Sequence, residues 1–419
     1  MRPVLGSGRF RAWLAAVASG AVLAGVAVLG LPATPGAVVE HAPLAASAPP
    51  HELAVRRLLA QRAAAVRAGD EAAFAATVDP WAPAEFRQRQ LAWFRALAQV
   101  PLAEWSYRLD ATTEPAGDSW SPHVVLRYAL AGVDSVPTTR PVAQSFVRRG
   151  GSWYVADDAG AHRWRGPWDF GPCHVERTAT GLVIGHEREP VERVARQLDA
   201  AVRDVTEVWG PGWDQRVGVL VPATREELLA LVGPGFTAEG IAAVAVADWV
   251  DVAARRVEGP RVVLNPRATE ELSDAALRVV LRHEITHIAS RAYTVDEAPM
   301  WMREGFADYV GYRDSRVPPR EIAPDLVRYV RTSGPPRGLP RDEDFHQADR
   351  QLRLAYQLSW SFVRHLAQRF GEERLVRLYH RVAATGAPDQ TEAALREETG
   401  LTTAELTRGW ATDLATTFG

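Results

Sequence analysis

His283, Glu284 and His287 have the residue types and the spacing of a metal-dependent hydrolytic site. They stand in the run His283-Glu284-Ile285-Thr286-His287, within a helical pattern that we expect to begin at the N-cap residue Ser273. Residues four apart lie on one face of a helix, so both imidazoles can reach one ion while Glu284 projects beside them. The pattern predicts that the two histidines bind a metal and that Glu284 acts as general base on water bound to that metal.

A third ligand is predicted from the run Trp301 to Tyr309, which follows Pro299 and has a helical pattern. Glu304 lies within it and supplies a carboxylate. Asp308 lies one turn further along the same face and can accept a hydrogen bond from the far nitrogen of a ligand histidine. Cys173 is the single cysteine, which excludes a cysteine-based zinc cluster. We therefore expect one Zn²⁺ held by His283, His287 and Glu304, with an open fourth position.

The two motifs, H-E-I-T-H and E-G-F-A-D, resemble those of the gluzincins, the clan of zinc metallopeptidases that contains thermolysin and the zinc aminopeptidases. The resemblance covers residues 175–419. It implies that His283, His287 and Glu304 bind zinc, that Glu284 activates water, and that Asp308 supports a histidine ligand. It also implies an oxyanion donor at Tyr356, at a position resembling the downstream catalytic tyrosine of the aminopeptidases. Tyr309 is a competing candidate, and a packing role for Tyr356 is the alternative.

The sequence favours an endopeptidase over an aminopeptidase. The aminopeptidases of the clan carry a G-x-M-E-N motif, whereas the methionines here are Met1, Met300 and Met302. The spacing of the motifs departs from the clan: 16 residues separate His287 from Glu304, slightly fewer than in thermolysin or the aminopeptidases, which suggests a relative of shorter form and leaves the subfamily open. We expect an edge strand, such as Arg261–Leu264 or Ile241–Ala247, to pair with the extended backbone of a peptide substrate. The alternative is that these strands belong to the core.

Two other functions fit the same residues. One is a non-catalytic extracytoplasmic binding or sensor protein in which the zinc is structural. Structural zinc sites are usually closed by four protein ligands, and no fourth candidate lies at short spacing, which favours the catalytic interpretation. The other is a zinc amidase that acts on cell-wall peptides, which shares the chemistry and differs in substrate.

The amino-terminal segment predicts export. Arg2, Arg9 and Arg11 precede an apolar stretch from Ala12 to Leu31, and residues 32–50 are rich in alanine and proline. We expect residues 1–31 to be a signal peptide or an N-terminal membrane anchor and residues 32–50 to be a linker. The remaining chain is then extracytoplasmic, either secreted or anchored to the membrane.

Composition and pattern divide the remaining chain into two domains of an α+β protein. Hydrophobic residues make up 47% and charged residues 24%, as in soluble globular proteins, and the net charge of −3 argues against a nucleic-acid partner. Residues 51–160 read as helices followed by strands, an order that resembles the NTF2-like or SnoaL-like domain. Residues 175–419 are expected to form the metallopeptidase domain, with a small mixed sheet and a largely helical C-terminal part. Its expected partner is a peptide or protein substrate.

Overall fold

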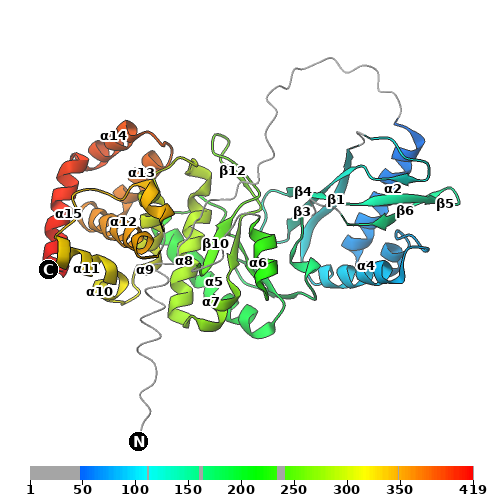
Figure 1. The fold of residues 1–419 in the computed structure, drawn as a ribbon, viewed down its shortest axis with the longest axis horizontal. Coiled ribbons are helices and arrows are strands. Elements are labelled where there is room, and N and C mark those ends of the chain that lie inside the picture. The colour runs from blue at the N-terminus through cyan, green and yellow to red at the C-terminus, as the bar shows by residue number, and fades with distance from the viewer. Residues whose placement is uncertain (1–47, 111–112, 160–163, 234–240, 348, 419) are drawn as a thin grey trace, which may run out of the picture.

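The computed structural model describes residues 48–110, 113–159, 164–233, 241–347 and 349–418. Three parts follow one another in space as they do in sequence: an N-terminal unit of helices and sheets, a central sheet, and a C-terminal helical part (Figure 1). The protein is therefore an α+β protein, as predicted. The expected leader at 1–31 and linker at 32–50 lie almost entirely outside the described residues. Within those residues, no helix has the length and apolar character needed to cross a membrane.

The N-terminal unit packs three helices against two small antiparallel sheets. One sheet has the order β1-β3-β4 and the other β2-β5-β6. In the β1/β3 pair, Trp105 lies opposite Tyr128 and Leu109 opposite Val124, and these four side chains are buried. The helices are α2 (Pro50–Ala68), α3 (Glu71–Ala75) and α4 (Ala84–Leu97), and the strands are β1 (Leu102–Asp110), β2 (Ser119–Trp120), β3 (His123–Leu130), β4 (Thr138–Val142), β5 (Ser145–Arg149) and β6 (Ser152–Asp157). The predicted NTF2-like resemblance of this unit and the predicted domain boundaries stay predictions.

The central sheet is mixed, with the described strands in the order β10-β13-β9-β8-β7. The three inner strands are parallel, and an antiparallel strand flanks them on each side. Near-continuous apolar runs build the inner strands, as expected where both faces of a sheet are covered. The bounds are β7 (His174–Arg177), β8 (Gly181–Gly185), β9 (Val217–Val221), β10 (Ala243–Val246) and β13 (Arg261–Leu264). A hairpin of β11 (Trp249–Asp251) and β12 (Arg256–Glu258) connects β10 to β13.

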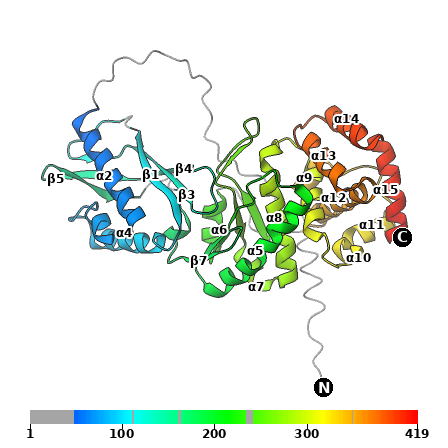
Figure 2. The ribbon, with the colours of Figure 1, turned by 180° about the vertical axis from the view of Figure 1, so that it is seen from behind.

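Different layers cover the two faces of this sheet. Helices α5 (Arg188–Trp209) and α8 (Asp274–Ser290) share a core with one face, and Figure 2 shows them from that side. The other face packs against α6 (Arg225–Val232) and against Leu130, Val133 and Trp168, so the N-terminal unit and the sheet share a core.

A buried ion pair also joins the N-terminal unit to the sheet. Arg261 of β13 donates two hydrogen bonds of 2.7 Å to the carboxylate of Asp134, which follows β3. The Arg261 side chain passes close to Gly218 of β9, where a Cβ atom would lie 2.9 Å from Arg261 Cδ. Burial alone would lower the pKa of the Arg261 guanidinium. The adjacent Asp134 carboxylate has the larger effect, so the pKa is raised. This pair is therefore a fixed contact between the two parts.

The C-terminal part is helical and holds the second half of the predicted site. Its central element α9 (Met300–Tyr312) crosses both α8 and α12 (Asp349–Phe370). At Gly305 a Cβ atom would lie 2.7 Å from the carbonyl oxygen of Ser359, so only glycine lets α9 approach α12 this closely. The other helices of this part are α10 (Pro319–Ile322), α11 (Pro324–Ser333), α13 (Glu372–Val382), α14 (Pro388–Thr399) and α15 (Thr403–Phe418), while the short α7 (Pro266–Glu271) connects β13 to α8 in the central part.

Candidate metal centre

Helix α8 carries the first motif and begins where the sequence predicts. The Ser273 side chain accepts a hydrogen bond of 3.2 Å from the Ala276 amide, and Asp274 stands in the first turn. The helix continues to Ser290, so His283 and His287 lie one turn apart in its second half. Both imidazoles are buried, with 5% and 9% of their surface exposed.

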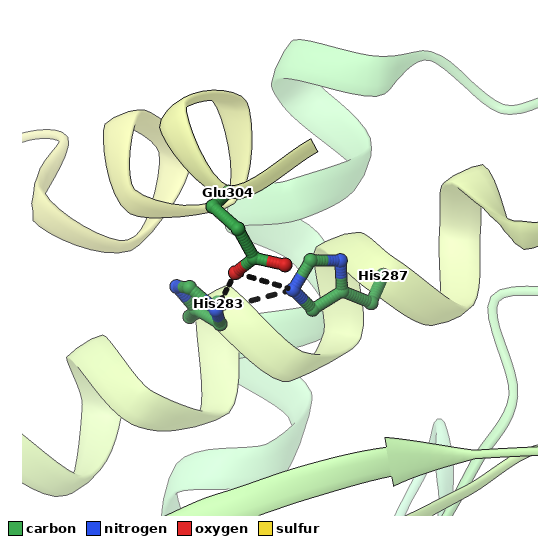
Figure 3. A group of neighbouring side chains, drawn as sticks. All are labelled: His283, His287 and Glu304. Carbon is green, nitrogen blue, oxygen red and sulfur yellow. Dashed lines mark hydrogen bonds and ion pairs between the residues drawn. The ribbon is translucent and has the colours of Figure 1, made fainter. Parts of the chain in front are cut away.

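Helix α9 brings Glu304 against these two histidines (Figure 3). Glu304 Oε2 lies 3.5 Å from Nε2 of His283 and 3.5 Å from Nε2 of His287, and the two Nε2 atoms are 3.1 Å apart. The structure thus brings together the three residues that the sequence nominated as ligands, from two helices.

Asp308 fixes the tautomer of one histidine. Nδ1 of His283 donates to Asp308 Oδ1 at 2.9 Å, which leaves the lone pair of Nε2 directed at Glu304 and His287. A lone pair beside a second ring nitrogen and a carboxylate oxygen is suited to coordinate a cation placed among them. Asp308 thus lies where a residue that orients a ligand histidine is expected.

The cluster fits a tetrahedral zinc ion. Two ligand atoms each about 2.0–2.1 Å from zinc and separated by the tetrahedral angle lie roughly 3.3 Å apart, close to the spacings of 3.1 and 3.5 Å found here. Glu304 has no exposed surface, and among the described residues its contacts of 3.5 Å with the two histidines are too long to be good hydrogen bonds. A buried carboxylate without good hydrogen bonds is costly unless it is paired or coordinates a metal.

Glu284 lies beside the three ligands and faces the edge of the central sheet. Its carboxylate accepts a hydrogen bond from the backbone N–H of Ala245 in β10, while Oε2 has no partner among the described residues. Burial raises the pKa of this carboxyl above its usual range, although the adjacent histidines partly offset the effect. Glu284 thus offers a free, buried oxygen next to the metal position, which is what a general base requires.

The two candidate tyrosines occupy different surroundings. Tyr309 donates its hydroxyl to Glu372 Oε1 at 2.7 Å, so that hydroxyl is already engaged by a residue outside the ligand cluster. Tyr356 is fully buried and packs edge-on against Phe345. Burial raises its pKa well above the usual range, and the nearby charges of Glu304, Asp308 and Glu284 add to the increase. Of the two, Tyr356 has the electrostatic surroundings of the site, and its catalytic role stays a prediction.

The expectation that β13 could be a substrate-binding edge is wrong, because β13 lies between β9 and β10. Among the described strands, β10 forms that edge. Ala242 O accepts from Asn265 N, which directs Ala242 toward β13, so Ala243 and Ala245 direct their backbone groups away from β13. Ala245 was not singled out from the sequence, because a backbone amide leaves no signal in residue type.

No protein-family model matches this chain, and no curated protein matches it in sequence. Among solved structures, the chain is similar to an M1 zinc metallopeptidase from Deinococcus radiodurans, seen as a mutant bound to a Tyr-Ser-Ala substrate. The identity is 13%, the match covers 74% of this chain and 71% of that chain, and the TM-score is 0.35. A second structure of an M1 zinc metallopeptidase from that organism gives 14% identity, 74% and 70% coverage, and a TM-score of 0.33. Similarity at this level establishes neither family membership nor activity.

Proposed function

We propose that the protein is an extracytoplasmic zinc metallopeptidase that hydrolyses internal peptide bonds. The observation that carries the proposal is the convergence of His283, His287 and the fully buried carboxylate of Glu304, with Glu284 beside them. Three protein ligands leave zinc a fourth position, and a bound zinc ion would supply Lewis acidity toward water and the scissile carbonyl.

The residues of the chain have separate parts in this reaction. His283, His287 and Glu304 would hold the zinc ion, and Asp308 orients His283. Glu284 takes the proton of the attacking water at its free carboxylate oxygen and delivers it to the leaving amine, while Ala245 N–H holds the other oxygen. Tyr356 is the candidate donor to the oxygen that gains negative charge.

The edge strand β10 supports cleavage within a chain. The backbone of Ala243 and the carbonyl of Ala245 face the side where Glu284 lies, so an extended peptide can add to the sheet there while the Ala245 N–H stays bound to Glu284. The sequence also lacks the G-x-M-E-N motif of the aminopeptidases. Both features favour a substrate that extends on each side of the scissile bond.

The test compares three full-length proteins: wild type, Glu284→Gln and, as a matched control, Glu270→Gln, which alters an exposed carboxylate on α7. Zinc content is measured by elemental mass spectrometry and hydrolysis with internally quenched peptides and cell-wall peptides. We expect one zinc per chain in all three and loss of peptide hydrolysis in Glu284→Gln alone. Zinc without hydrolysis in the wild type would favour a structural site, and hydrolysis of cell-wall peptides alone would favour the amidase.

The proposed location rests on the arginines before the apolar stretch Ala12–Leu31. Protease added to intact spheroplasts should digest the body of the protein. Protection of the body until the membrane is opened would place it in the cytoplasm.

A further inference from the structure

A cavity of about 370 Å³ lies beside the C-terminal end of the helix that carries the metal motif. Its walls come from the β11–β12 hairpin, the segments 135–136 and 212–216, and the end of α8 with the short helix η2 (Arg291–Tyr293). In Figure 1 the hairpin, labelled at β12, rises beyond β10. The catalytic groups proposed above do not include any residue of this cavity.

The cavity continues the path along which a substrate would lie. Ile288, which lines it, follows Glu284 by four residues and so lies on the same helical face, about 6 Å further along the axis. The strand β10 leads into the same hairpin, and η2 contacts both hairpin strands. Because an extended chain advances about 3.3 Å per residue, a side chain two or three residues from the scissile bond would reach the cavity.

The lining is positively charged. Arg216, Arg255 and Arg256 contribute guanidinium groups, against one carboxylate, that of Asp214. Asp214 accepts a hydrogen bond of 2.6 Å from Ser135, and Arg256 pairs with Glu258 at 2.7 Å. These contacts leave a surplus of positive charge at the cavity.

Arg255 has the surroundings of a ligand-binding arginine. Its guanidinium lies 4.7 Å from the ring centre of Tyr293, which also lines the cavity, and it makes no ion pair with a carboxylate of the described residues. The indole Nε1 of Trp213, another lining residue, is buried and has no acceptor among the described residues. A guanidinium stacked on an aromatic ring and a second N–H donor together suit a carboxylate.

We propose that this cavity is a specificity subsite for a carboxylate of the substrate, namely an acidic side chain two or three residues from the scissile bond. The inference rests on the proposed function, because it assumes that the substrate is a peptide lying along β10. Arg255 is the specificity-determining residue, and Tyr293 positions its guanidinium.

The test measures binding without hydrolysis. Full-length Glu284→Gln, loaded with zinc, is titrated into three fluorescent peptides by anisotropy: one with an internal glutamate and an amidated C-terminus, one with glutamine in its place, and the glutamine peptide with a free C-terminus. We expect the glutamate peptide to bind about tenfold more tightly than the amidated glutamine peptide. Preference for the free C-terminus instead would identify the terminal carboxylate as the ligand and overturn the assignment to an internal acidic side chain.

Two further variants on the Glu284→Gln background assign the effect. Arg255 has a φ of 51° and exposed Arg316 a φ of 58°, so asparagine, which tolerates this backbone conformation, replaces each of them. Arg255→Asn should abolish the preference and Arg316→Asn should keep it. Equal binding of the three peptides, no binding of any, or a preference that survives Arg255→Asn would overturn the inference. If Glu284→Gln prefers the glutamate peptide but the wild type hydrolyses no peptide, the proposed function alone is contradicted.

Discussion

Asp308 accepts a hydrogen bond from Nδ1 of His283 across 2.9 Å, between two helices that cross at the metal centre. The two side chains are almost fully buried, with 4% and 6% of their surface exposed. Because the contact determines which ring nitrogen carries the proton, it controls whether Nε2 is available to a metal.

We predict that Asp308→Asn weakens zinc binding about 10- to 100-fold, since an amide holds the imidazole less firmly and does not raise its basicity. Competition with a chromophoric chelator measures this affinity. Asp314→Asn, at an exposed residue beyond the end of α9, is the control. Equal zinc affinity in wild type and Asp308→Asn would show that Asp308 does not support His283 as a zinc ligand.

The local features of this site were predictable from the sequence, whereas its surroundings were not. The spacing of His283, His287 and Glu304 and the N-cap at Ser273 depend on helical geometry, which residues close in sequence determine. The position of β10 at the edge depends on the order of strands, and the direction of the Tyr309 hydroxyl depends on Glu372, 63 residues away. Such contacts between distant residues follow from tertiary packing, and residue patterns alone do not encode them.

The oxyanion donor can be tested with two phenylalanine substitutions. Tyr356→Phe should lower turnover about 10²- to 10³-fold with zinc content unchanged, because it removes one hydrogen bond to the developing charge. Tyr309→Phe should leave turnover within a few-fold of wild type, since its hydroxyl is bound to Glu372. Turnover and metal content are measured on the same samples. Near-normal activity of Tyr356→Phe would leave this tyrosine a packing role against Phe345.

The contact between Asp134 and Arg261 should be important for stability. Replacing Asp134 by asparagine leaves a buried guanidinium, with 6% of its surface exposed, without its counter-charge. We expect the free energy of unfolding to fall by about 3–5 kcal/mol, as for other broken buried pairs.

Urea denaturation measures this change for Asp134→Asn and for Asp118→Asn. Asp118 pairs with Arg148 at 2.9 Å on the surface, with 62% and 54% of the side chains exposed, so its loss should cost less than about 1 kcal/mol. Equal costs for the two variants would show that the Arg261 contact adds nothing beyond a surface pair.

A histidine far from the metal centre should give stability a specific pH dependence. Nε2 of His186 lies 2.8 Å from Glu227 Oε1, and Nδ1 lies 3.0 Å from the carbonyl oxygen of Pro172. Both neighbours are acceptors, so the doubly protonated imidazolium satisfies both contacts. The hydrogen bond to Glu227 raises the pKa of His186, burial opposes the shift, and the Pro172 carbonyl adds to it.

A pKa raised by folding stabilises the folded state where the imidazole is protonated in both states, which means below its unfolded pKa of about 6.5. This contribution is lost as pH rises through the higher folded pKa. His186→Gln should therefore destabilise the protein more at about pH 5.5 than at about pH 9. Urea unfolding at both pH values, with the exposed His123→Gln as control, gives the difference. A destabilisation by His186→Gln that is equal at both pH values, or larger at the higher one, would show that protonation of His186 does not stabilise the fold.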